Sequence, residues 1–226
     1  LGEEEIPREM ERFEAALQAT REQIHDIQLK VASAIGHDTA SLFDAHLMVV
    51  DDRSFIEEVI RRVRGQRINV EAVLRAVSDR YANVLANVGD DYLRERAADV
   101  HDVTRRILRN LAGRNSSFLD QIEEPCVVIA HDLTPSDTAS LTRSMVIAFA
   151  TDRGSPTSHT AIMARALGIP AVVGLHDISV RISSGEPVLI DGHKGIAILR
   201  PDETTRERYG RIREKRETIE ISLASL

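Results

Sequence analysis

The first half of the chain, up to about residue 113, repeats its apolar residues every three or four positions. Such spacing places them along one face of an α-helix. The first segment carries this stripe at Met10, Phe13, Leu17, Thr20, Ile24, Ile27 and Val31. Three further segments cover 41–63, 70–88 and 90–113, and the third has Asn69 in position to cap it. Glycines suited to helix ends follow or close the four segments, at Gly36, Gly65, Gly89 and Gly113. We therefore predict an all-α helical domain, built as a bundle or as a pair of hairpins.

From about residue 125 the apolar residues occur instead in short β-branched runs: CVVIA, MVIAFA, PAVVG, PVLID and GIAIL. Gly, Pro, Asp or Ser bounds each run, as is typical of strands. Helical patterns separate the first three runs, and a Gly-His-Lys-Gly turn separates the last two, which predicts an α/β domain. We place the helical domain at 1–116, the α/β domain at 117–200 and a charged C-terminal linker helix at 201–226.

Composition narrows the class of protein. An apolar fraction of 42% and a charged fraction of 29% predict a soluble globular protein. The net charge of -7 argues against a nucleic-acid partner, because such binding relies on basic surface. No apolar stretch approaches the roughly 20 residues of a membrane-spanning helix, and the N-terminus does not resemble a signal peptide. We expect a cytoplasmic protein with no membrane partner. The lone Cys126 excludes an internal disulfide and is expected to pack in the core.

The segment GSPTSHTAIMARALGIPAVVG carries the most informative chemistry. Gly154, Ser155 and Pro156 form a loop, Ser158 is a fair N-cap, and His159 falls in the first turn of the helix that follows. A helix N-terminus disfavours a protonated ring and favours an anion. We therefore expect a neutral, nucleophilic His159 facing a site that can accept a phosphoryl group.

Spacing alone leaves other interpretations of these residues open. A lone histidine near a helix start is more often a surface or capping residue. A metal site is a weaker hypothesis, because the pairs at His131, His176 and His193 are scattered and lack the spacing of metal motifs. A serine hydrolase is disfavoured, because no G-x-S-x-G elbow occurs. A P-loop and a dinucleotide-binding glycine motif are also absent from the sequence.

The segment DLTPSDTASL follows the first predicted strand of the α/β half. Thr134, Pro135 and Asp137 fit the N-cap, first and third positions of a capping box. That pattern predicts a helix and requires no function. It nevertheless places Thr138 near the carboxyl end of a strand, where ligand sites of α/β proteins gather.

The motifs T-S-H, A-I-M-A-R and G-I-P-A-V-V-G resemble the phosphohistidine segment of the phosphoenolpyruvate-utilising enzymes. Within that group, LFDAHLMVVDD, DDYLRERAADVHDVTRRILRNLAG and AHDLTPSDTASL are similar to the Enzyme I family of the bacterial phosphotransferase system. The resemblance covers nearly the whole chain. It implies an α/β phosphohistidine domain of the swivelling type beside an all-α domain that binds the phosphocarrier protein HPr.

The resemblance also implies a role for particular residues. Phosphoenolpyruvate would phosphorylate His159 at Nε2, and the phosphoryl group would pass to a histidine of HPr. Thr138 matches a threonine that orients this ring by a hydrogen bond. Arg165 belongs to the motif but lies on another helix face, so we expect a structural salt bridge rather than a phosphate contact. The residues that match the HPr contacts are His46, Met48, Val49, Asp52, Phe55, Leu85, Leu93 and Arg96.

The sequence also departs from the family pattern. Ser155 stands where the family usually has a second glycine, and Pro156 replaces a polar residue, so the loop is expected to be stiffer. The chain begins with Leu1, and the resemblance implies that an opening strand precedes it. The resemblance further implies that a barrel domain, which binds phosphoenolpyruvate with Mg²⁺ and carries the dimer contact, follows Leu226. We expect this chain to be a monomer, to hold no cofactor itself and to be unable to use phosphoenolpyruvate alone.

Two alternatives remain at this point. The chain could be the phosphohistidine domain of an enzyme similar to pyruvate phosphate dikinase or phosphoenolpyruvate synthase, although these lack the helical insert. It could also be a carrier-docking module that transfers nothing. The residues do not distinguish a sugar-uptake pathway from a nitrogen-linked one.

Overall fold

The computed structural model describes residues 1–34, 36–113, 122–139, 141–156 and 158–224, and the chain divides into two compact units. The helical unit comprises Leu1–Glu123 together with Thr134–Leu141. The α/β unit comprises Glu124–Leu133 and Thr142–Leu226. The boundary that the sequence predicts after residue 116 lies outside the described residues.

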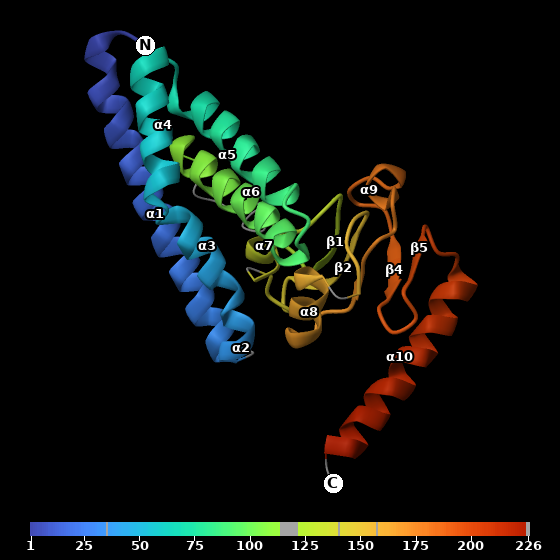
Figure 1. The fold of residues 1–226 in the computed structure, drawn as a ribbon. Coiled ribbons are helices and arrows are strands. Elements are labelled where there is room, and N and C mark those ends of the chain that lie inside the picture. The colour runs from blue at the N-terminus through green and yellow to red at the C-terminus, as the bar shows by residue number, and fades with distance from the viewer. Residues whose placement is uncertain (35, 114–121, 140, 157, 225–226) are drawn as a thin grey trace. The chain divides into compact units, whose positions relative to one another are not determined.

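The helical unit is organised around long helices that bury one apolar face each. Helices α5 and α6 are joined by a short connection and pack side by side as an antiparallel hairpin, and α1 packs against α6 (Figure 1). The stripe predicted on α1 is buried at Phe13, Ile24 and Val31, which confirms the period of the first segment. The elements are η1 (Glu3–Glu5), α1 (Ile6–Ala34), α2 (His37–Ala40), α3 (Leu42–Val50), α4 (Arg53–Gln66), α5 (Val70–Ala86), α6 (Asp91–Leu111) and α7 (Pro135–Ala139).

The prediction of one continuous helix over 41–63 is wrong. The chain breaks between α3 and α4, where the Asp52 carboxylate accepts a hydrogen bond of 3.0 Å from the backbone N–H of Phe55 and so caps α4. A side chain that satisfies a free N–H at a helix start stabilises a new helix at that point. Helix α4 also continues past Gly65 and ends at Gln66, where the next residue, Arg67, caps it with a φ of 55°.

The predicted caps of the other helices agree better with the structure. Asn69 caps α5 by accepting a hydrogen bond of 3.3 Å from the N–H of Ala72. Gly113, just after α6, has a φ of 65°, a conformation that glycine adopts without steric strain. These two signals therefore locate the ends of the α5–α6 hairpin correctly.

Helix α7 lies within the helical unit although the strand before it belongs to the α/β unit. Its capping box has formed: the Asp137 N–H donates to Thr134 Oγ1 at 3.1 Å, and the Thr134 N–H donates to Asp137 Oδ2 at 3.2 Å. Asp137 is buried and also pairs with Arg109 of α6, at 3.6 Å. The sequence predicts this short helix, whereas its packing against α1 and its ion pair with Arg109 of α6 depend on tertiary contacts.

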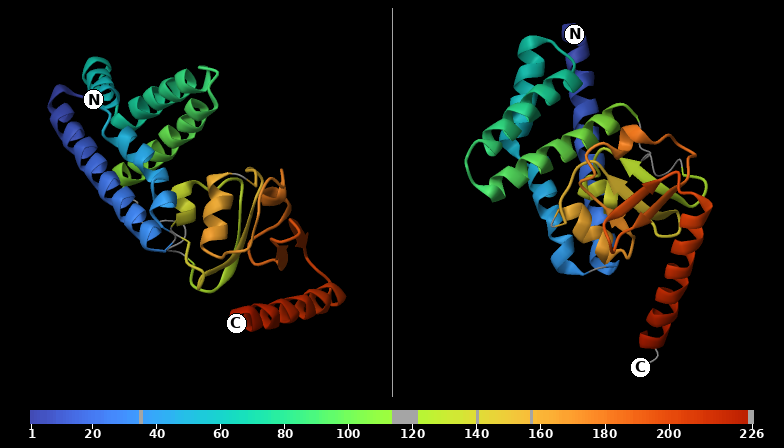
Figure 2. Two further views of the ribbon diagram at one scale, coloured as in Figure 1. Left: turned by 60° about the horizontal axis from the view of Figure 1, so that its bottom comes forward. Right: turned by 90° about the vertical axis from the view of Figure 1, so that its right-hand side faces the viewer.

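The α/β unit contains two sheets (Figure 2). In the described residues, β1, β2 and β3 form a parallel sheet in that order, and β4 and β5 form an antiparallel hairpin. Phe149, Ala150 and Val172 are buried on this sheet, so the β-branched runs do form strands. The elements are β1 (Cys126–Ala130), β2 (Val146–Thr151), α8 (His159–Ala166), β3 (Ala171–Val172), α9 (Ile178–Arg181), β4 (Val188–Asp191), β5 (Ile196–Leu199) and α10 (Glu203–Ala224).

Two expectations from composition can be compared with the structure. None of the helices in the described part of the chain is long and apolar enough to cross a membrane. Cys126 lies in β1 and is half-buried as a free thiol, so it is less enclosed than the sequence predicts.

Candidate functional site

His159 is the first residue of α8, as the sequence predicts. Ser158 has extended backbone angles, and its hydroxyl accepts a hydrogen bond of 3.3 Å from the N–H of Ala161. The His159 side chain is half-buried and makes no hydrogen bond or ion pair with the residues that the structure describes. The ring is therefore held by the capped helix and keeps its nitrogens available for another group.

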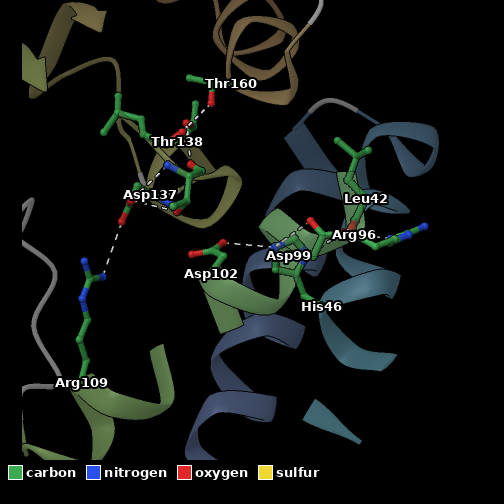
Figure 3. Close-up of polar contacts among 11 residues, drawn as sticks. Leu42, His46, Arg96, Asp99, Asp102, Arg109, Asp137, Thr138 and Thr160 are labelled. Atoms are coloured by element: carbon green, nitrogen blue, oxygen red, sulfur yellow. Dashed lines mark hydrogen bonds and ion pairs between the residues drawn. The ribbon is translucent and has the colours of Figure 1, made fainter. Parts of the chain in front are cut away.

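Thr160 anchors the first turn of α8 to the end of the first strand. Its buried hydroxyl donates a hydrogen bond of 2.7 Å to the backbone carbonyl of Leu133, which follows β1. Figure 3 labels Thr160 and draws this bond as a dashed line. No local sequence pattern predicts this bond, because Thr160 and Leu133 are 27 residues apart.

The loop before His159 approaches the end of β3 closely. Gly154 has a φ of 109°, and a Cβ atom placed there would lie 3.1 Å from Cβ of Val173. Gly174 has a φ of 77°, and a Cβ atom there would lie 3.0 Å from the carbonyl oxygen of Gly154. Both glycines are thus required for the loop to fold against the strand ends.

A second polar cluster lies at the carboxyl ends of β1 and β2. The buried carboxylate of Asp152 accepts hydrogen bonds from the N–H and hydroxyl of Ser179, and it pairs with Nδ1 of His131 at 2.9 Å. The Ser179 hydroxyl, its N–H and His131 lower the pKa of Asp152 to about 2, against the opposing effect of burial. This network fastens α9 to the sheet and explains why Asp152 remains ionised.

Thr138 lies in α7 and is fully buried. Its hydroxyl donates a hydrogen bond of 2.9 Å to the backbone carbonyl of Thr134. Thr138 belongs to the helical unit and His159 to the α/β unit. The orienting bond between them therefore stays a prediction.

The helical unit contains an apolar groove of about 620 Å³, formed by residues of α3, α4, α5 and α6 with Asp52. The lining residues are Ala45, Met48, Val49, Asp52, Phe55, Arg80, Tyr81, Val84, Leu85, Leu93, Arg96 and Val100. All the residues predicted to bind a partner belong to this set except His46. The structure brings them together on one surface, while their role in binding stays a prediction.

The groove combines exposed apolar side chains with charged ones. Met48 is 72% exposed and Val84 is 62% exposed, whereas Phe55 is buried and packs edge-on against Tyr81 with ring centroids 5.2 Å apart. Arg80 pairs with Glu58 at 3.0 Å, and Arg96 pairs with Asp99 at 3.1 Å. Large exposed apolar side chains flanked by charges are typical of protein-docking surfaces.

Some residues that line this groove were not predicted to bind a partner. Arg80, Tyr81 and Val84 were not singled out, although Tyr81 and Leu85 are four residues apart and so share a helix face. That spacing could have identified them. The salt bridge expected for Arg165 is not found among the described residues, where its side chain is exposed.

His46 is buried and does not line the groove, with only 1% of its surface exposed. Its Nε2 lies 3.2 Å from Asp102 Oδ2 and 3.8 Å from Asp99 Oδ1, and its Nδ1 lies 3.3 Å from the carbonyl oxygen of Leu42 (Figure 3). Any contribution of His46 to binding must therefore pass through its neighbours.

A search of the described residues for three or more His, Cys, Asp or Glu side chains placed to hold a metal ion finds no such group. Two histidines of the scattered pairs take part in hydrogen bonds: His131 Nδ1 lies 2.9 Å from Asp152 Oδ2, and the backbone N–H of His193 donates to Asp191. Asp152 supports α9, and Asp191 accepts hydrogen bonds from the N–H groups of His193 and Lys194 in the β4–β5 turn.

Both units of the chain match family models of phosphoenolpyruvate-utilising enzymes. Residues 122–195 match the family described as "PEP-utilising enzyme, mobile domain", and residues 1–96 match "PEP-utilising enzyme, N-terminal". A solved structure titled as Enzyme I (nEIt) is 43% identical, with a TM-score of 0.76, and the match covers 96% of this chain and 88% of that one. The chain belongs to the Enzyme I family, the phosphoenolpyruvate-protein phosphotransferases.

Curated relatives support the same assignment. A phosphoenolpyruvate-protein phosphotransferase of Listeria monocytogenes is 39% identical over 92% of this chain, and one of a Bacillus species is 38% identical over 98%. A solved N-terminal domain of "Enzyme 1 - Nitrogen" is more distant, at 26% identity and a TM-score of 0.64, with 93% of this chain and 85% of that chain covered. The chain spans 36% of the Listeria relative and 38% of the Bacillus relative. The dikinase-like alternative is not favoured by these matches.

Proposed function

We propose that this chain accepts a phosphoryl group on Nε2 of His159 and exchanges it with a histidine of the phosphocarrier protein HPr. Phosphoenolpyruvate is the original source of the group in this proposal. The observation that carries it is the position of His159 in the first turn of α8, capped by Ser158, with no other side-chain partner among the described residues.

The transfer requires one bond to form and one to break. The lone pair of His159 Nε2 attacks phosphorus, and the P–N bond to the carrier histidine breaks as its electron pair returns to that ring. The proton of His159 stays on Nδ1, which keeps Nε2 the nucleophile. The free N–H groups at the start of α8 stabilise the phosphoryl oxygens. In this proposal Thr138 orients the ring.

The apolar groove is the proposed docking surface for HPr. It offers exposed apolar side chains such as Met48 and a charged rim that includes Asp52 and Arg96. We place phosphoenolpyruvate, its Mg²⁺ ion and the dimer contact in the part of the relatives that this chain does not span. The proposal also assigns the protein to the cytoplasm, as a monomer in the form of this chain.

The direct test is to mix the ¹⁵N-labelled chain with phosphorylated HPr and record the imidazole resonances. We expect an Nε2-phosphorylated ring at His159. The matched control is His159→Ala, which should dock HPr with unchanged affinity and take up no phosphate. Docking without phosphorylation of the unaltered chain would support a docking module instead, and phosphate on another residue would contradict the proposed role of His159.

A further inference from the structure

One buried carboxylate of the helical unit is paired with three arginines. Glu58 of α4 contacts Arg61 through its Oε2 atom. Its Oε1 atom lies 2.6 Å from Arg62 and 3.0 Å from Arg80. Arg61 and Arg62 belong to the same helix as Glu58, whereas Arg80 comes from α5. Among the described residues, none of the three arginines pairs with a second carboxylate, so one negative charge here is matched with three positive ones.

The two arginines of α4 are sufficient to keep Glu58 ionised. The hydrogen bonds from Arg61 and Arg62 lower the pKa of Glu58 to about 2, against the opposing effect of burial. A buried carboxylate that loses its only cation is strongly destabilising. Glu58 would keep two cations if Arg80 turned toward another group. Arg80 can therefore bind elsewhere without leaving an uncompensated charge behind it.

The Arg80 side chain also keeps most of its own hydrogen-bonding capacity. A guanidinium has five N–H donors, and among the described residues Arg80 uses one of them, in the bond to Glu58. Its central carbon lies 5.8 Å from the centre of the Tyr81 ring, a cation–π contact that uses no donor. The side chain is 51% exposed, and exposed ion pairs stabilise a fold only slightly because water and salt screen them. Arg80 can thus bind a further carboxylate at little cost to the fold.

Arg80 and Val84 lie between two hollows of the surface. Both residues line the apolar groove, and both line a second hollow of about 740 Å³ on α5. The residues of this second hollow are Ala76, Asp79, Arg80, Asn83, Val84, Asn87 and Val88. Arg80, Val84 and Val88 follow one another at four-residue intervals and so share one face of α5, where Val84 is 62% and Val88 is 56% exposed. A partner that covers the groove and this face would enclose Arg80 and exclude water from it.

We propose that Arg80 is a specificity-determining residue for HPr docking, which forms a salt bridge with a carboxylate of the carrier. This role rests on the proposed function. The carrier must then present an Asp or Glu side chain beside the apolar side chains that contact Val84. Because the carrier excludes water, this salt bridge is stronger than the exposed pair of Arg80 with Glu58. A carrier with a basic side chain at the same place would bring two cations together and be rejected.

The first test compares the Kd for unphosphorylated HPr among variants of the chain by calorimetric titration. Arg80→Gln is expected to raise the Kd about tenfold at low salt, and less at high salt. Arg75→Gln makes the same change at an exposed position of α5 outside both hollows and should leave the Kd unchanged. Arg61→Gln removes a different cation from Glu58, also outside both hollows, and should bind normally. A loss with Arg80→Gln no larger than with either control would overturn the proposal.

The second test measures stability and needs no partner. The urea midpoint of Arg80→Gln should equal that of the unaltered chain, because Glu58 keeps Arg61 and Arg62 in the variant. A clearly lower midpoint would mean that Glu58 depends on Arg80, and it would overturn the proposal.

The third test identifies the carboxylate on the carrier. Each Asp and Glu of HPr is neutralised in turn and combined with Arg80→Gln in a double-mutant cycle. One HPr variant should be strongly non-additive with Arg80→Gln and additive with Arg75→Gln, whereas additivity for every HPr carboxylate would overturn the salt bridge. If the unaltered chain does not bind HPr at all, the proposed docking function fails and the role of Arg80 fails with it. Normal binding by Arg80→Gln would contradict the role of Arg80 alone.

Discussion

The hydroxyl of Thr160 donates a hydrogen bond of 2.7 Å to the carbonyl oxygen of Leu133, which joins the start of α8 to the end of β1. The residue beside Thr160 is His159, whose own ring takes no part in this bond. The helix start that carries the histidine is therefore fixed by its neighbour. His159 remains free for chemistry while its backbone stays in place.

We predict that Thr160→Val destabilises the chain by about 1–3 kcal/mol, because it removes a buried donor and keeps the shape of the side chain. The free energy of unfolding measured in urea tests this. Thr160→Ser is the control, since it retains the hydroxyl and should lose less stability. Equal stabilities of the Val and Ser variants would contradict the importance of the bond to Leu133.

The cap of α8 offers a second prediction. Ser158→Ala should destabilise the chain by about 1 kcal/mol, because the N–H of Ala161 loses its acceptor. Ser158→Asp keeps an acceptor oxygen and adds a charge that suits the helix N-terminus, so it should restore most of the stability. Thermal unfolding of both variants provides the measurement, and an Asp variant as unstable as the Ala variant would count against the cap.

Exposed apolar residues of the groove should contribute to docking without supporting the fold. We expect Met48→Ala to weaken HPr binding by about 1–2 kcal/mol, or roughly 5–30-fold, with little change in unfolding. Met48 is 72% exposed, so few packing contacts are lost within the chain itself. Val180→Ala, at a position on α9 that is 83% exposed and outside the groove, is the control. Calorimetric titration with HPr should show weaker binding for the Met48 variant and unchanged binding for the Val180 variant.

The depressed pKa of Asp152 predicts a stability that depends on pH. Its pKa falls from 3.8 to about 2 in the folded chain, chiefly through the bonds from Ser179. A lowered folded-state pKa stabilises the fold above the unfolded value and loses this contribution as pH falls toward 2. Asp152→Asn should therefore be clearly less stable than the unaltered chain at pH 7, and the difference should shrink by pH 3.

The control for this pH dependence is Asp132→Asn, which changes an exposed carboxylate near the same strand end. Its stability should follow that of the unaltered chain from pH 7 to pH 3. A constant difference between Asp152→Asn and the unaltered chain over this range would mean that Asp152 stabilises the fold by shape rather than by charge.

Local signals in the sequence identified much of this fold. The apolar stripe of α1, the Asn69 cap of α5, the capping box of α7 and the position of His159 each depend on residues a few positions apart. The break at Asp52 was missed because the apolar residues keep a helical spacing across it. That spacing does not indicate that the Asp52 carboxylate caps a second helix.

Longer-range relationships were less accessible. His46 was singled out by resemblance as a partner contact, but its burial against Asp99 and Asp102 depends on how α3 packs on α6. Tyr81 is a different case, because its four-residue spacing from Leu85 is a local pattern that could have placed it in the groove. Residues more than fifty positions apart, such as His46 and Asp102, form pairs that no local pattern encodes.

Residues Thr134–Leu141 belong to the helical unit, although the residues on both sides of them belong to the α/β unit. The helical unit is therefore discontinuous in sequence. A gene segment that ended at Glu123 would encode helices without α7, and it would leave Arg109 without its partner Asp137. A segment that began at Glu124 would carry α7 away from the helices it packs against. Exchange of either half by a single recombination event would therefore damage both, so the helical and α/β units are expected to be inherited as one piece.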